Sequence, residues 1–275
     1  MGTAELVALM LADGRLPTGG HTQSAGLEPA VRAGLGADGK QLHEVETYAR
    51  DRLRTVTRVD AAVAVVARHV VLTAEQHPDP PSRGDRPGPD SPSRESRSAN
   101  HDRDPRLGGQ SDHESQVGRL GPALGFGLGV VEEAWAGRTS SQVVRGVVRR
   151  QGRLLLRLAG RVWPGVAGYL PPDGEVPRPI VLGVVAAVTG LSAEQLARVV
   201  AYDDAQTVVS ASLKLLPVDP AEAATWLAAL HGDIEELVAD VAPLTDIDKI
   251  PANAAPLIDI HAQNHVTERM RLFHA

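Results

Sequence analysis

Apolar residues recur along most of this chain at the spacing that gives an α-helix one buried face. The clearest stretch begins at Thr139, where valines and leucines fall on one side and arginines take much of the remainder. Gln142 stands three residues after Thr139, which is the spacing of a capping box, and Pro164 ends the pattern. The sequence therefore predicts an amphipathic helix between these two limits.

Helices are indicated on both sides of that stretch. Ser192 and Gln195 repeat the capping-box spacing before an apolar run that reaches Leu216. Asp38 and Gln41 form a similar arrangement before another periodic run. Further helical segments are expected at 42–56, 60–72, 120–135, 179–190, 220–230 and 233–241. Because no alternating strand pattern is found, the expected fold class is all-α, a single-domain helical bundle spanning residues 1–275.

The composition changes sharply between His77 and Gln116. This tract contains seven prolines, and its only apolar residues are Ala99 and Leu107. Such a segment buries too little apolar surface to offset the entropy lost on ordering. A long disordered surface insertion is therefore predicted at 77–116. A domain linker is the alternative, but the helical pattern is of the same kind on both sides.

Composition limits the classes of partner. Hydrophobic residues make up 43% of the chain and aromatic residues only 3%, which favours helices packed through small side chains. The formal net charge of -6 argues against binding to nucleic acid or to an anionic membrane. The start of the chain carries Glu5 and lacks the basic region of a signal peptide. With no apolar run near the roughly 20 residues that span a bilayer, a cytoplasmic location is expected.

Signatures of catalysis are absent from the sequence. There is no cysteine, no GxxxxGK[ST] phosphate loop and no GxSxG nucleophile motif. None of the histidines follows a glutamate by three residues, as helical di-metal sites require. No catalytic residue is predicted, and the expectation is that the protein is not an enzyme. The acidic pair Asp203–Asp204 is expected to lie on a helix surface, and Asp246, Asp248 and Asp259 in turns or on helix surfaces.

The acidic residues above could also suggest acid/base or cation sites, and two histidines are further candidate metal ligands. His261 and His265 are four residues apart, so a helix would place both imidazoles on one face, where they could hold Ni²⁺ or Zn²⁺. Exposed polar residues are the commoner explanation, because no third ligand is close in sequence. The pair supports one alternative function, a small helical nickel-binding protein. A helical transcriptional module is a further alternative, which the acidic charge disfavours.

Four separated segments of the chain resemble the UreF family of urease accessory proteins. Residues 11–28 contain Leu-Pro-Thr-Gly followed by Ser-Ala-Gly-Leu-Glu, which is similar to the N-terminal pattern of that family. Residues 136–152 and 213–218 are similar to its middle segments. Residues 255–273 resemble its terminal signature, which ends in Arg-Leu-Phe, although Val266 and Arg269 depart from it.

This resemblance implies a function and a set of partners. It implies a homodimeric, chaperone-like scaffold without a permanently bound cofactor. The scaffold would bind UreD or UreH, recruit the GTPase UreG, and pass nickel through the complex to apo-urease. The residues that the resemblance assigns to partner binding are Gly19, Gly20, Ser24, Gly26, Leu27, Glu28, His265, Arg271, Leu272 and Phe273.

Three of these assignments carry specific expectations. The glycines of the N-terminal motif are expected to permit a tight turn. Glu28 is expected to contact the GTPase or the metal path, with helix capping as the alternative. Leu272 and Phe273 are expected to insert into a partner groove, with Arg271 pairing at its rim. The alternative is that the tail folds back on its own bundle.

Overall fold

The computed structural model describes residues 2–18, 20–36, 42–76, 122–266 and 272–273. Within these ranges every regular element is a helix and no strand occurs, which confirms the predicted all-α class. The predicted insertion at 77–116 lies outside the described residues, as do Asp38 and Gln41 of the proposed N-terminal cap. No helix in the described part of the chain is long and apolar enough to cross a membrane.

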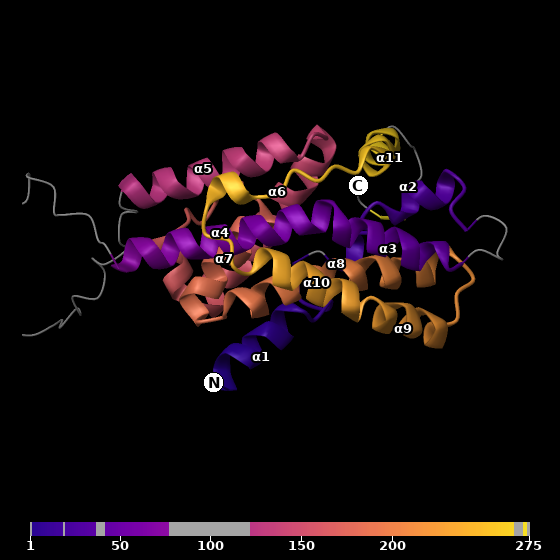
Figure 1. The fold of residues 1–275 in the computed structure, drawn as a ribbon, viewed down its shortest axis with the longest axis horizontal. Helices are drawn as coiled ribbons and strands as arrows, with labels where there is room; N and C mark the ends of the chain where they lie inside the picture. Colours follow the sequence, from indigo (N-terminus) through magenta and orange to yellow (C-terminus); the bar gives the residue numbers. More distant parts are fainter. Residues whose placement is uncertain (1, 19, 37–41, 77–121, 267–271, 274–275) are drawn as a thin grey trace, which may run out of the picture.

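The α-helices follow one another along the chain in a single bundle (Figure 1). They are α1 (Gly2–Leu11), α2 (Leu27–Arg32), α3 (Glu44–Arg54), α4 (Val56–Gln76), α5 (Pro122–Arg138), α6 (Gln142–Val162), α7 (Arg178–Thr189), α8 (Ala193–Leu215), α9 (Pro220–Ala229), α10 (His231–Val241) and α11 (Pro256–Val266). Short 3-10 turns lie at η1 (Gly20–Thr22), η2 (Pro164–Gly168) and η3 (Ile247–Lys249).

Helix α4 forms the centre of the core and packs against α7, α8 and α5. Its residues from Ala61 to Ala67 are all buried, and all of them are alanine or valine. These small side chains let neighbouring helices approach closely. A Cβ atom added to Gly183 of α7 would lie only 2.5 Å from the Ala64 carbonyl oxygen. The low aromatic content of the sequence therefore corresponds to a core built by close helix contact.

The helix ends test the capping predictions. The capping box of α8 is confirmed, because the Gln195 backbone N–H donates to Ser192 Oγ at 3.1 Å and the Ser192 N–H donates to Gln195 Oε1 at 2.9 Å. The predicted start at Thr139 is wrong by two residues. Ser141 is the N-cap of α6 and accepts the Val144 N–H, whereas the Thr139 carbonyl accepts a hydrogen bond from the guanidinium of Arg145.

The run predicted as one helix over 42–56 also ends early. Helix α3 begins at Glu44, and the chain leaves helical geometry at Thr55 before α4 begins. The hydroxyl of Thr55 donates to the carbonyl of Asp51 at 2.6 Å and so takes an acceptor at the end of the helix. Arg52 of α3 and Asp60 of α4 both line one cavity.

Candidate functional site

The N-terminal motif forms a tight turn that leads into α2. Gly26 adopts a left-handed conformation with φ of 79°, and Ser24 Oγ accepts the Glu28 backbone N–H at 3.2 Å. The hydroxyl of Tyr48 donates to the carbonyl of Ala25 at 3.0 Å and lies 2.8 Å from where a Cβ of Gly26 would stand. The tight turn expected at the glycines is thus confirmed at Gly26. Gly20 lies in η1, whereas Gly19 is outside the described residues.

This turn directs Glu28 into the protein, where its carboxylate binds the C-terminal tail. Glu28 is 1% exposed. Its Oε1 accepts the Leu272 backbone N–H at 2.8 Å, and its Oε2 accepts the Phe273 N–H at the same distance. The guanidinium of Arg32 donates to Oε1 at 2.7 Å. A carboxylate with three such donors holds a segment 244 residues away in sequence.

The protonation state of Glu28 follows from these contacts. Burial alone would raise the pKa of this carboxyl. The hydrogen bonds from Leu272, Phe273 and Arg32 outweigh burial, and the pKa lies below its ordinary value. Glu28 is therefore an anion at neutral pH, which is the form that accepts both tail amides. We call Ser24, Glu28, Arg32, His265, Leu272 and Phe273 the tail-binding site.

The two tail residues have different surroundings. The ring of Phe273 is 4% exposed and lies under the Lys214 ammonium, which is 5.1 Å from the ring centroid. The side chain of Leu272 is 60% exposed. The structure therefore shows the Phe273 ring folded back on its own bundle, which was the alternative to insertion into a partner groove. Arg271 lies outside the described residues.

The two histidines of the candidate pair, His261 and His265, lie in different surroundings. His265 is 1% exposed, and its Nε2 lies 3.5 Å from Glu28 Oε2. The Nδ1 of His261 is buried and has no hydrogen-bond partner. In the part of the chain that the structure describes, no group of three or more metal-ligating side chains is found. The structure therefore places His265 in the tail-binding site and gives the pair no third ligand.

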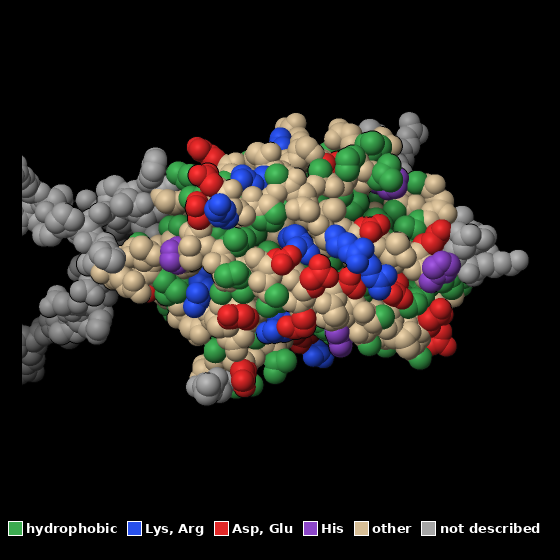
Figure 2. All heavy atoms as spheres, in the orientation of Figure 1, with side chains coloured by type: hydrophobic (Ala, Val, Ile, Leu, Met, Phe, Trp, Pro, Cys, Tyr) green, Lys and Arg blue, Asp and Glu red, His purple; other side chains and the backbone are tan. Residues whose placement is uncertain are grey.

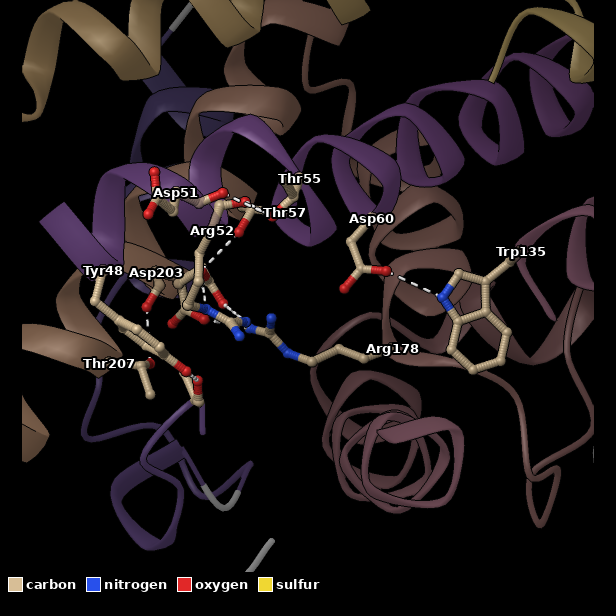
Figure 3. Close-up of polar contacts among 12 residues, drawn as sticks. Tyr48, Asp51, Arg52, Thr55, Thr57, Asp60, Trp135, Arg178, Asp203 and Thr207 are labelled. Carbon is tan, nitrogen blue, oxygen red and sulfur yellow. Dashed lines mark hydrogen bonds and ion pairs between the residues drawn. The ribbon is translucent and has the colours of Figure 1, made fainter. Parts of the chain in front are cut away.

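A cluster of partly buried charges, drawn in Figure 3, lines the same cavity as Ser24 and His265 of the tail-binding site. Asp204 of α8 accepts two hydrogen bonds from Arg52 of α3, at 2.6 and 2.9 Å, and one from Thr57 at 2.7 Å. Asp203 pairs with Arg178 at 3.0 Å. The surface position expected for Asp203 and Asp204 is therefore wrong, because α3, α4 and α7 cover this part of α8. No local sequence pattern predicted the partners of Asp203 and Asp204, because these partners come from three other helices.

Asp60 is the carboxylate of this cluster without an ion pair. Its Oδ1 accepts the Trp135 indole N–H at 3.0 Å (Figure 3). Burial raises the pKa of Asp60 to about 6, and neighbouring Asp204 acts in the same direction. Burial would also raise the pKa of Asp204, but the Arg52 guanidinium outweighs it and holds that pKa below the ordinary value.

The charge cluster and the tail-binding site border one interior space. A cavity of about 150 Å³ is lined by Asp60, Trp135, Arg178, Ser24 and His265, among others. Asp203 and Arg178 also line a second cavity, of about 480 Å³, which reaches Lys214 and Phe273. Phe273 therefore belongs to the hydrophobic core and at the same time borders a cavity with polar groups in its lining. Rearrangement of the tail would therefore change the lining of a cavity that Asp203 and Arg178 also border.

The fold and site define an all-α protein in which a buried carboxylate, that of Glu28, binds the backbone amides of the C-terminal tail. Comparison with known proteins adds the family. The family model UreF matches residues 40–231, and the chain belongs to that family. The matched region contains the charge cluster but neither Glu28 nor the tail.

Individual relatives match over most of their length. The urease accessory protein UreF of Mycobacterium sp. strain JLS is 31% identical over 239 residues, which cover 86% of this chain and 80% of that protein. The protein of the same name from Mycobacterium bovis strain BCG / Pasteur 1173P2 is 29% identical over 251 residues, covering 89% and 90%. A third, from Mycolicibacterium vanbaalenii, is 29% identical over 237 residues, covering 85% and 84%. The resemblance seen in the sequence is thereby confirmed.

Proposed function

We propose that this protein is a non-catalytic scaffold of urease maturation in the cytoplasm. In this proposal it acts as a homodimer, binds UreD or UreH, and recruits the GTPase UreG. Nickel is the cargo, passed through the complex to apo-urease. The relatives are urease accessory proteins by name, which supports the general role. The observation that carries the scaffold role is the tail-binding site.

The geometry of that site suits the presentation of a docking segment. Phe273 and the backbone amides of the tail are anchored inside, whereas Leu272 projects to the surface. An exposed apolar side chain on an anchored backbone loses little conformational entropy when a partner covers it. Glu28 therefore acts, in this proposal, by holding the tail in the shape that the partner recognises. This role differs from direct contact between Glu28 and the GTPase or the metal.

The nickel-binding alternative has less support. It requires His261 and His265 to act together, but His265 is occupied against Glu28. Within the described residues no third ligand accompanies the pair. Isothermal titration of the isolated protein with Ni²⁺, with a His261→Ala variant beside it, tests this alternative. Tight stoichiometric binding that the substitution removes would favour it over the scaffold.

The scaffold proposal is tested by assembly with the cognate UreD or UreH and UreG proteins. The wild-type chain is expected to elute with them as one complex of defined mass by size exclusion and light scattering. A Glu28→Gln variant presents an amide N–H₂ to one tail N–H, so it should lose one hydrogen bond to a charged acceptor and weaken the other. It should bind the complex at least about tenfold more weakly.

A matched control separates loss of the tail contact from loss of charge. Glu46→Gln removes a carboxylate of α3 that pairs with Arg50 four residues later, away from the tail. This variant should assemble as the wild type does. Amide exchange at Leu272 and Phe273 should accelerate only in Glu28→Gln. If the tail amides are released and assembly is unchanged, the tail is not the docking segment. If the wild type forms no complex with folded partners, the scaffold proposal itself fails.

A further inference from the structure

Helix α6 has a charge pattern unlike that of the rest of the chain. Its 21 residues include no aspartate or glutamate and the following six arginines: Arg145, Arg149, Arg150, Arg153, Arg157 and Arg161. The opposite side carries the buried residues Gly152, Leu155, Leu156 and Ala159, and α6 packs on α7. The whole chain has a formal net charge of -6. A purely basic helix on an acidic protein requires an explanation beyond solubility.

The arginines divide into two groups. Arg145 and Arg149 are used within the fold, because Arg145 donates to the Thr139 carbonyl and Arg149 pairs with Glu132 at 2.7 Å. Arg149 also lies over the Trp135 ring, 5.3 Å from its centroid. Arg149 thus links α6 to α5, whereas Arg145 binds the connection between these helices.

The other four arginines share one exposed face. Arg150, Arg153, Arg157 and Arg161 follow one another at intervals of three, four and four residues, so they form a row of about 16 Å along the helix. We call this row the arginine stripe. Arg153 pairs with Glu175, but this contact is long at 3.6 Å and largely exposed. In the described residues, neither Arg157 nor Arg161 has an ion-pair partner.

The row of like charges destabilises α6 taken by itself. Like charges three or four residues apart on a helix repel each other, and α6 has no acidic residue to offset them. Elsewhere the surface is mixed: on the face in Figure 2, basic and acidic side chains lie next to one another. Ion pairs there include Arg50 with Asp233 and Arg198 with Glu235. The stripe is therefore a local exception, and the charges of Arg157 and Arg161 are available to an external group.

The composition of the stripe indicates a protein as that external group. Leu154, 38% exposed, lies on the same face between the arginines. Arginine beside an aliphatic side chain is typical of protein interfaces, where the guanidinium forms paired hydrogen bonds to a carboxylate. A second copy docked across a two-fold axis would place arginine against arginine, so a symmetric self-contact is disfavoured. The net acidic charge of the chain disfavours nucleic acid and anionic lipid.

We propose that the arginine stripe of α6 is the docking surface for a different protein, one that presents a row of carboxylates beside an apolar contact. The inference rests on the scaffold function above and adds to it a second surface, separate from the tail-binding site. One side of the scaffold would then hold a partner through its tail, and α6 would hold an acidic partner by charge. Two independent surfaces are what assembly of several proteins around one scaffold requires.

The test reverses charge on the stripe. An Arg157→Glu, Arg161→Glu variant is compared with an Arg54→Glu, Arg198→Glu variant, which changes the net charge equally at exposed sites elsewhere. Binding to purified cognate UreD or UreH, UreG and apo-urease is measured at 50 and 300 mM NaCl, concentrations at which screening differs strongly (Debye lengths of about 14 and 6 Å). The stripe variant should lose about tenfold or more in affinity for one partner, the same partner whose binding to the wild type weakens with salt.

Each other outcome has a definite meaning. If the folded stripe variant, checked by its circular dichroism and Tm, binds every partner as the wild type does, the inference is wrong and the scaffold function stands. If the wild type binds none of these proteins, both fail. A DNA duplex and phosphatidylserine vesicles serve as further probes. Stripe-dependent binding to either probe, with unchanged protein binding, would overturn the inference in favour of that class of ligand.

Discussion

Asp60 and Asp204 offer a direct test of the buried charge cluster, because the same substitution should change stability in opposite directions. Both carboxylates line one cavity. Asp60 accepts a hydrogen bond from Trp135 but has no ion pair, and burial raises its pKa to about 6. Asp204 is paired with Arg52, which holds its pKa below the ordinary value. Asparagine keeps the shape of each side chain and the carbonyl oxygen that accepts a hydrogen bond.

The magnitude for Asp60 follows from linkage. Its pKa of about 6 exceeds the ordinary value of 3.8 by about two units. Between those pH values the folded state binds more protons than the unfolded state, so the free energy of unfolding falls as pH rises from about 4 to 6. Above pH 6, ionisation of Asp60 lowers the free energy of unfolding by up to about 3 kcal/mol, because one pKa unit corresponds to about 1.4 kcal/mol. Asp60→Asn should therefore stabilise the protein by about 1–3 kcal/mol at pH 7.5.

The companion substitution removes a charge that the fold requires. Asp204→Asn leaves the Arg52 guanidinium buried without its counter-charge, which typically costs about 3–5 kcal/mol. Urea denaturation of both variants and the wild type at pH 4.5, 6.0 and 7.5 measures the effects. The gain from Asp60→Asn should shrink towards zero at pH 4.5, where wild-type Asp60 is already protonated. A loss of stability at pH 7.5 in Asp60→Asn, comparable with that of Asp204→Asn, would refute this account.

Further predictions concern backbone approach and capping, all measured by urea denaturation. Gly183→Ala should destabilise by about 1–3 kcal/mol or more because α4 lies too close, whereas Gly129→Ala, with open space around it, should stabilise by about 0.5–1 kcal/mol. Equal effects would contradict the packing argument. Gly26→Ala should cost about 1–2 kcal/mol from its positive φ alone, and more if Tyr48 must move. Ser192→Ala should cost about 1 kcal/mol; no change would mean that the capping box is dispensable.

The sequence was most informative about the helices themselves. Periodicity and capping chemistry located α8 to within a residue at its start, since the side chains of Ser192 and Gln195 each bond to the other's backbone N–H. The start of α6 was misplaced because Thr139 and Ser141 both offer a hydroxyl near that end. Arg145, whose guanidinium takes up the carbonyl of Thr139, decided between them. Local patterns cannot rank two such candidates without the contacts of the next turn.

The sequence predicted separate parts of the tail-binding site but not how they fit together. The N-terminal motif and the tail were each recognisable, but nothing in either segment showed that Glu28 would hold the backbone of Leu272 and Phe273. Asp204 was misassigned for a related reason. A helical pattern shows which residues share a face, but not which helix covers that face. An acidic pair in a largely apolar helix, with Arg52 elsewhere at a similar inward position, was the available signal.

The contact between Glu28 and the tail also sets an order of events during synthesis. Glu28 leaves the ribosome 244 residues before the backbone groups that it binds. At about 5–20 residues per second, that interval lasts roughly 12–50 s. For all of that time the bundle can form around a carboxylate that lacks its tail partners. The tail-binding site is therefore completed only after all the helices of the bundle have been synthesised.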